Sequence, residues 1–173
     1  GFLNLPLPKG GRLALVTYSG AQAIMSIDAA VEEGLQMARF AGPTRERISQ
    51  VVATASKAQN PVDLFPDMLV HGFEKTTREV VKALLEDDGV DAIIFISFAN
   101  AGAEPFHPLV EVLQEPLGKP VFFSLLGAKK DIDVCQAFLE EHKLPCYDFP
   151  EMAVRAFAHM WRYAQKKGLG CRV

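Results

Sequence analysis

The sequence predicts an α/β fold in which a parallel sheet carries helices on both faces, as a three-layer sandwich. Short apolar runs alternate with amphipathic segments along the chain, and most connections between them are short. The run at 90–98 is almost continuously apolar, which is typical of a central parallel strand covered on both faces. The chain has 173 residues, of which 49% are hydrophobic and 23% are charged, as expected for one globular domain.

The N-terminal part of the chain contains an arm, a strand and a helix. Residues 1–10 are rich in Pro and Gly and are predicted to form a linker or arm. Residues 12–17 form the first predicted strand, and 18–22 form a turn of mostly small residues. A helix is predicted at 23–33, with Gly34 at its end. The residues expected to share its apolar, core-facing side are Ala23, Ile24, Ile27, Ala30 and Val31.

A second strand and a second helix follow. Apolar and polar residues alternate at 35–40, which predicts a strand with one less buried face. Gly42 and Pro43 interrupt the chain, and Thr44 is expected to cap a helix that runs to about Val52.

The connection at 53–72 is longer than loops of compact domains usually are. It contains the segment Asn60-Pro61-Val62-Asp63. Pro61 favours an extended backbone at Asn60, so the amide of Asn60 and the carboxylate of Asp63 are presented rigidly. The simplest interpretation is a loop staple, in which Asp63 accepts backbone hydrogen bonds.

The C-terminal part repeats the alternation of helices and strands. Strands are predicted at 90–98, 119–126 and 145–148, and helices at 73–86, 106–114, 129–141 and 150–166. The domain is therefore expected to span 11–167, with 168–173 as a tail.

Five parallel strands with these crossovers predict the flavodoxin-like order 2-1-3-4-5. In that order the topological switch point lies between the first and third strands, and ligands bind outside the carboxyl ends there. The turns at 18–22 and 99–103 follow these two strands, so they should lie side by side. A strand that leads into a helix through such a turn directs free N–H groups outward, which suits an anion.

Composition and charge argue against several classes of function. A formal net charge of −3 gives no broad surface for nucleic acid. No apolar run reaches the roughly 20 residues of a membrane span, and the N-terminus does not have the pattern of a signal peptide. The three cysteines have no CxxC spacing, which argues against a zinc site or a disulfide framework and suits the cytoplasm.

Other chemistries of this fold fit the turns poorly. A flavin phosphate site would need more hydroxyls than Thr17 and Ser19 supply. A phospho-acceptor domain would need acidic residues where Tyr18-Ser19 and Ser97-Phe98 stand. A nucleophile elbow would need glycines two residues before and after Ser19. Of the four histidines, His71 and His107 lie nearest the predicted site, whereas His142 and His159 lie on predicted helices.

Six motifs occur in register along the chain: 11–20, 28–30 with 33–35, 60–63 (NPVD), 88–94 (DGVDAII), 119–121 and 147–156. With these motifs the sequence resembles the second flavodoxin-like, succinyl-CoA-synthetase-like domain of NDP-forming acyl-CoA synthetases, the acetate–CoA ligase (ADP-forming) type, over about residues 10–167.

The resemblance implies a part in the reaction of acid, CoA and ATP to acyl-CoA, ADP and phosphate through a phosphorylated histidine. It implies partners on other domains: a CoA-binding domain, a phospho-histidine domain and an ATP-grasp domain. This domain would lend helix N-termini to the phosphoryl group. The phosphate-binding role then falls on Ser19, Gly20, Ala21, Gln22, Asn100, Ala101 and Gly102, with Asn60 and Asp63 in support.

The sequence departs from the family at several points. Ala21 replaces one of the consecutive glycines after the first strand, and no phospho-histidine motif, CoA-binding fingerprint or ATP-grasp region occurs. The chain is therefore expected to hold no catalytic residue, no metal and no cofactor by itself; CoA, ATP and Mg²⁺ are implied only for the complete enzyme. Two alternatives remain open: a stand-alone interaction or regulatory module, and a small-molecule sensor with a ligand at the switch point.

Overall fold

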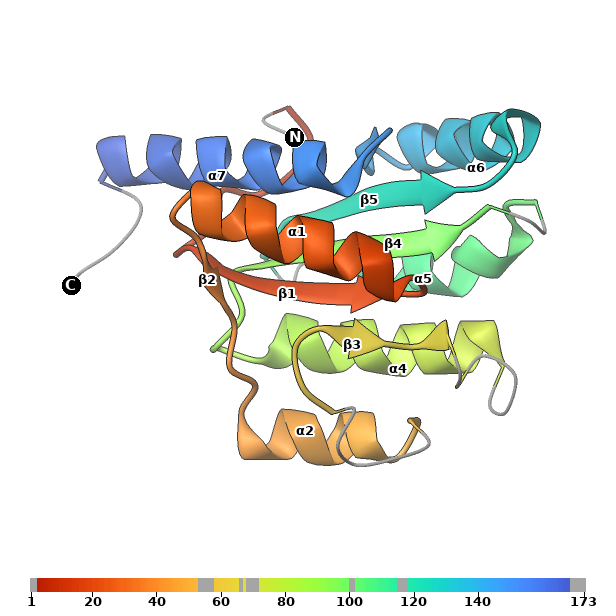
Figure 1. Cartoon of the computed structure of the whole chain (residues 1–173), viewed down its shortest axis with the longest axis horizontal. Coiled ribbons are helices and arrows are strands. Elements are labelled where there is room, and N and C mark those ends of the chain that lie inside the picture. Colours follow the sequence, from red (N-terminus) through yellow and green to blue (C-terminus); the bar gives the residue numbers. More distant parts are fainter. Residues whose placement is uncertain are drawn as a thin grey trace.

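A parallel β-sheet forms the centre of the structure, with helices on both faces (Figure 1). The computed structural model describes residues 3–52, 58–65, 67, 72–99, 102–114 and 118–168. The strand order β2-β1-β4-β5-β6 confirms the predicted order 2-1-3-4-5, with the run at 90–98 in the central position. The strands are β1 (Arg12–Thr17), β2 (Gln36–Met37), β3 (Val62–Asp63), β4 (Ala92–Phe98), β5 (Val121–Leu126) and β6 (Cys146–Tyr147).

One edge of β1 is shared by two short strands. β2 pairs with Arg12 and Leu13, whereas β3, a strand that the sequence pattern did not predict, pairs with Val16 and Thr17. Between them the side chain of Asn60 takes the place of a strand. Its Oδ1 accepts a hydrogen bond from the backbone N–H of Leu15 at 2.9 Å, and its Nδ2 donates to the carbonyls of Leu13 at 2.7 Å and Ala38 at 3.1 Å.

The helices form two layers. α1 and α7 cover one face of the sheet side by side, and the other helices lie on the opposite face, with α2 packed against α4 (Figure 1). The helices are α1 (Gly20–Glu32), α2 (Gly42–Ser49), α4 (Phe73–Glu86), the 3₁₀ helix η2 (Glu104–Phe106), α5 (His107–Leu113), α6 (Lys129–Glu141) and α7 (Pro150–Lys166).

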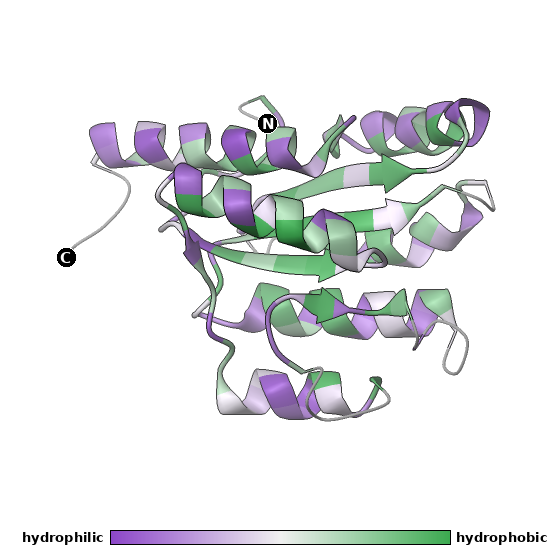
Figure 2. Ribbon diagram, viewed as in Figure 1, coloured by the Kyte–Doolittle hydropathy of each residue, from purple (hydrophilic) through white to green (hydrophobic). Residues whose placement is uncertain are grey.

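The central strand β4 explains why the core has two halves. Its side chains alternate, so Phe95 packs toward α4 and α5 while Ile94 and Ile96 pack toward α1 and α7. All three side chains are fully buried. Figure 2 shows β1, β4 and β5 as largely hydrophobic, as strands covered on both faces should be.

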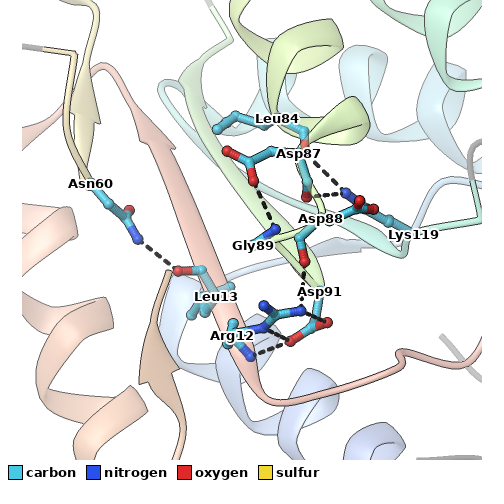
Figure 3. Close-up of polar contacts among 9 residues, drawn as sticks. All are labelled: Arg12, Leu13, Asn60, Leu84, Asp87, Asp88, Gly89, Asp91 and Lys119. Atoms are coloured by element: carbon cyan, nitrogen blue, oxygen red, sulfur yellow. Dashed lines mark hydrogen bonds and ion pairs between the residues drawn. The ribbon is translucent and has the colours of Figure 1, made fainter. Parts of the chain in front are cut away.

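A polar network fixes the amino edge of the sheet (Figure 3). The carboxylate of Asp91 accepts hydrogen bonds from the backbone N–H of Arg12 at 2.9 Å and from its guanidinium at 2.7 and 2.9 Å. Lys119 Nζ donates to the carbonyls of Leu84 at 3.3 Å and Asp87 at 2.5 Å, which lie at the C-terminal end of α4. The network thus ties β1, α4 and the start of β5 together.

Asp87 lies at the centre of this edge. Its carboxylate accepts hydrogen bonds from the backbone N–H groups of Ala41 at 2.8 Å and Gly89 at 2.7 Å. Burial alone would raise the pKa of Asp87, but hydrogen bonds from Thr44 and these two N–H groups, together with the charge of Lys119, lower it below the ordinary value.

Three expectations about local structure are corrected. Thr44 is not a helix cap: α2 begins at Gly42, with Ala41 as its N-cap and Pro43 in the first turn, and Thr44 bonds Asp87 instead. The second strand is only two residues long, because Asn60 takes over its bonding to β1. Ile24 and Val31 do not face the core: their side chains are 62% and 69% exposed.

Substituting Asp87 with asparagine is expected to lower the free energy of unfolding at pH 7 by about 1–2 kcal/mol, because the charged acceptor is lost. The folded-state pKa lies below the ordinary Asp value of about 3.9, so ionisation of Asp87 stabilises the fold at neutral pH. That stabilisation is lost as the pH falls from this value through the folded-state pKa. In urea unfolding, the difference in free energy of unfolding between wild type and variant should be smaller at pH 3 than at pH 7.

The exposed neighbour Asp88 provides the control for this experiment. Its carboxylate makes no hydrogen bond within the described ranges, so Asp88→Asn should change stability little at either pH. A difference between wild type and Asp87→Asn that stayed constant from pH 7 to pH 3 would contradict the prediction.

Candidate functional site

The N-terminus of α1 lies at the carboxyl end of β1, next to the central strand. The first intrahelical hydrogen bond runs from the N–H of Ala23 to the carbonyl of Ser19 at 3.1 Å. The N–H groups of Gly20, Ala21 and Gln22 therefore have no partner within the helix. Ser19 is the N-cap, but its hydroxyl does not cap the helix, and Gly20 and Ala21 are exposed. As far as the described residues go, the turn thus offers free donors at the positive end of a 13-residue helix.

Two residues at the end of β1 hold this turn in place. Thr17 Oγ1 accepts a hydrogen bond from the N–H of Ser19 at 2.9 Å and donates to its carbonyl at 2.8 Å. Tyr18 points the other way, into the core, where its hydroxyl lies 2.7 Å from Thr77 Oγ1 and its ring stacks on Phe73. Burial raises the pKa of Tyr18, so it stays protonated and acts as an anchor for the turn.

Asp63 brings a carboxylate to the same place. Asp63 ends β3, where it lies opposite Thr17 of β1. Its Oδ1 accepts a hydrogen bond from the N–H of Phe65 at 3.1 Å, the kind of bond expected of a loop staple. A Cβ added to Gly20 would lie 3.8 Å from Asp63 Oδ2. The positive end of α1 therefore has a negatively charged neighbour.

The described part of the second predicted turn offers few free donors. Gly102 has a positive φ of 71°, and a Cβ there would meet the carboxylate of Glu104 at 2.5 Å. Pro105 and Pro108 lack an N–H, and the N–H of Phe106 already donates to the carbonyl of Ala103. Asn100 and Ala101, the other two residues predicted there, lie outside the described residues.

The two turns share one edge of the sheet. β1 and β4 are parallel neighbours in register from Leu13–Ala92 to Thr17–Ile96, and the N–H of Tyr18 donates to the carbonyl of Ile96 at 3.0 Å. The structure therefore brings the end of β1, Asp63 and the end of β4 to the switch point.

Among the described residues the histidines and cysteines form no separate cluster. His71 lies outside the described residues. His107 is exposed with its ring against Phe138, and His142 Nδ1 lies 2.8 Å from the Phe138 carbonyl. Burial raises the pKa of Cys135, and it raises that of Cys146 to about 12, so both thiols stay protonated at neutral pH.

The described residues form neither a metal site nor a membrane-spanning helix. Among the described residues no group of three or more His, Cys, Asp or Glu side chains is arranged to hold a metal ion. No helix in the part of the chain that the structure describes is long and apolar enough to cross a bilayer.

A cavity of about 430 Å³ opens far from the switch point, at the amino edge of the sheet. Leu5, Leu85, Lys119, His142 and Lys143 contribute to its lining. Lys119 is already bonded to carbonyls of α4 there, so this cavity adds nothing to the anion turn.

Comparison with known proteins relates the chain to one group of enzymes. No protein-family model matches it. It is 32% identical over 163 residues to acetate–CoA ligase (ADP-forming) II of Archaeoglobus fulgidus. The aligned region covers 94% of this chain and 24% of that ligase. The chain is homologous to one domain of the ADP-forming acetate–CoA ligases. The alpha subunit of ligase II of Pyrococcus furiosus is 28% identical over 171 residues, or 95% of this chain and 36% of that subunit.

Solved structures show the same fold for this ligase domain. A protein of Pyrococcus horikoshii superimposes with a TM-score of 0.84 over 95% of this chain and 38% of its own, at 24% identity. A dinucleotide-forming acetyl-coenzyme A synthetase of Candidatus Korarchaeum cryptofilum, in complex with phosphate and ADP, has a TM-score of 0.78 at 22% identity, over 98% of this chain and 37% of its own. The ligase domain thus spans about a quarter to just over a third of the relatives' length.

Phe65 is a feature of the ligase domain's site that the sequence pattern did not single out. Its ring is exposed at the switch point, one residue after the buried Leu64, and lies edge-on to Phe98 with ring centroids 6.1 Å apart. In the sequence Phe65 is simply an apolar residue shortly after the NPVD segment. Buried residues have the same appearance, so nothing in the sequence marks Phe65 as exposed.

Proposed function

We propose that this chain serves an NDP-forming acyl-CoA synthetase by binding the phosphoryl group of a partner domain's phospho-histidine at the N-terminus of α1. Gly20, Ala21 and Gln22 receive the phosphoryl oxygens through backbone N–H groups, with help from the hydroxyl of Ser19, whose own N–H donates to Thr17 Oγ1. Asn100, Ala101 and Gly102 of the second predicted turn are expected to contribute as well; Asn100 and Ala101 lie outside the described residues. The chain supplies charge stabilisation, and the nucleophile, CoA and nucleotide sites belong to the other domains.

The observation that carries this proposal is the unsatisfied, exposed N-terminus of α1 at the switch point of a domain homologous to ADP-forming ligases. A 13-residue helix with three N–H groups that have no partner among the described residues is a strong local dipole, and its first turn contains no acidic residue of its own. Gly20 leaves the first donor uncovered. The absence of a side chain there is not required by the fold, since an added Cβ would meet only Asp63 at an ordinary contact distance.

Asp63 makes the site favour a phosphoryl group carried by a protein over free phosphate. Its carboxylate repels free phosphate, so an anion in solution binds the turn weakly. A phosphoryl group held in place by a docked partner avoids the entropic cost of capture and tolerates this repulsion. The site is therefore suited to a group delivered on a protein rather than to a diffusing ion.

Phosphate titration of the isolated chain, followed by NMR of the backbone amides, tests this arrangement. Weak binding is expected, with the largest shifts at Gly20, Ala21 and Gln22. Asp63→Asn should tighten it about three- to tenfold, because one nearby negative charge is removed. Asp28→Asn, the same change in charge at an exposed position further along α1, should tighten it much less. Shifts confined to the amino edge of the sheet, or no response to Asp63→Asn, would argue against this site.

A further inference from the structure

Helix α1 has two apolar sides, and only one of them faces its own core. The side chains packed on the sheet are small: Ala23, Ser26, Ala29 and Ala30 are buried. The larger aliphatic residues point outward, with Ile24 62% and Val31 69% exposed, and Met25 is exposed as well. Ordinary surface helices have the reverse arrangement, with polar residues on the outer side.

The neighbouring helix α7 also carries an exposed apolar side chain. The two helices lie side by side on the same face of the sheet (Figure 1), and Glu33 at the end of α1 forms ion pairs with Arg155 and Arg162 of α7. Met152, one turn before Arg155, is 47% exposed. We call the surface formed by Ile24, Met25, Val31 and Met152 the α1/α7 face.

We infer that the α1/α7 face is the docking surface for the domain that carries the phosphoryl group. This inference rests on the proposed function. Ile24 and Met25 lie on the first two turns of α1, immediately after the N–H groups of Gly20 and Ala21. A protein that presents a phosphoryl group to that terminus must therefore lie against this part of the helix.

The length of the relatives supplies a suitable occupant. The homologous region covers 24% and 36% of two ADP-forming ligases, so most of each relative lies outside it and needs surfaces on which to pack. The inner side of α1 already packs on the sheet. The aliphatic side chains on its outer side therefore provide such a surface.

Charge on the face favours a protein over a membrane. Asp28 stands between Ile24 and Val31 on the exposed side of α1, and Glu32 follows. Arg155 is paired with Glu33. An anionic bilayer would require unpaired basic residues around the apolar patch, whereas a protein surface accommodates both signs of charge.

The test measures binding between the full chain and the rest of the synthetase, produced without the region homologous to this chain. The double variant Ile24→Asp/Val31→Asp places charge on the face, and its Kd by titration calorimetry should rise at least about tenfold. The control is Val134→Asp, because Val134 is 55% exposed on α6, in the opposite layer. It should leave the Kd unchanged. Thermal melts check that each variant folds, and Ile24→Ser/Val31→Ser offers a milder pair.

Three results would overturn the inference. The first is a Kd of the double variant within twofold of the wild type, and the second is no measurable binding by the wild type. The third is self-association of the chain that the double variant abolishes, since a second copy would then occupy the face. The substitution Gly20→Val separates this inference from the proposed function. If it leaves both the Kd and phosphoryl transfer intact, the phosphoryl role fails while docking on this face stands.

Discussion

Replacing Gly20 with valine in the complete synthetase is expected to slow phosphorylation of the partner histidine at least about a hundredfold, the usual cost of losing a preorganised donor to developing charge. Gly20 is the first residue of α1 and is exposed. A branched side chain there would cover the free N–H groups and hold the phosphoryl group away from them. CoA binding should not change, because this turn has no part in it under the proposed function.

The measurement is the rate of label transfer from γ-labelled ATP to the histidine, followed by rapid quenching. Gly42→Val is a matched control: Gly42 is likewise the first residue of a helix, and no atom lies within 4 Å of the position of its Cβ. It should transfer label at the wild-type rate. Gly102 is less suitable as a probe, because its positive φ would strain any other residue and confound folding with function. A Gly20→Val enzyme within twofold of the wild-type rate would refute the phosphoryl role of α1.

Replacing Asn60 with alanine is expected to lower the free energy of unfolding by about 2–3 kcal/mol. Its side chain makes three hydrogen bonds where β1 has no strand beside it. The carbonyl of Leu13 keeps a second donor, the N–H of Ala38, but the N–H of Leu15 loses its partner at a site where its side chain is fully buried. Most of the cost comes from this orphaned donor.

Urea unfolding of the variant and of Gln59→Ala measures the effect. Gln59 is the adjacent amide and is exposed, so its removal should cost less than about 0.5 kcal/mol. Asn60→Asp should be at least as damaging as Asn60→Ala, because it replaces a donor by a carboxylate facing two carbonyl oxygens. Equal stability of Asn60→Ala and Gln59→Ala would show that water replaces the amide without cost.

The regular elements were predictable because the hydrophobic pattern of each fits only one type of secondary structure. The helices at 73–86 and 129–141 were predicted with the bounds the structure gives, since each has one apolar side and a clear end. The run at 90–98 could only be a buried strand, and the alternation of elements then determined the sheet order. Local periodicity and the alternation of strands and helices were sufficient for this part of the fold.

α1 shows why the remainder was not predictable. When a helix is apolar on both sides, hydrophobicity cannot tell which side meets the sheet, and the larger residues Ile24 and Val31 were assigned inward by default. The helix packs on the sheet through small residues instead. Its first turn was likewise missed, because Gly20 and Ala21 resemble a loop in sequence.

Side chains that replace backbone leave even less trace in the sequence. Asn60 completes a sheet edge through tertiary hydrogen bonds, and no periodicity reports this. Thr44 has the sequence position of a cap, but Pro43 had already begun the helix, and the hydroxyl was used to bond Asp87. At the site, the sequence identified the NPVD segment, but only the coordinates place Asp63 beside Gly20.

The way the sheet ends has a consequence for the solubility of the chain. At one edge β1 is covered by the two-residue strands β2 and β3 and by the amide of Asn60; at the other, β5 is covered by the two-residue β6. Long open edges are templates on which a second molecule can add a strand and begin to aggregate. Here the outermost strand at each edge has only two residues, which is too short to be a template for a further strand. The long apolar strands β4 and β5 are thereby kept from intermolecular pairing as long as these short covers remain in place.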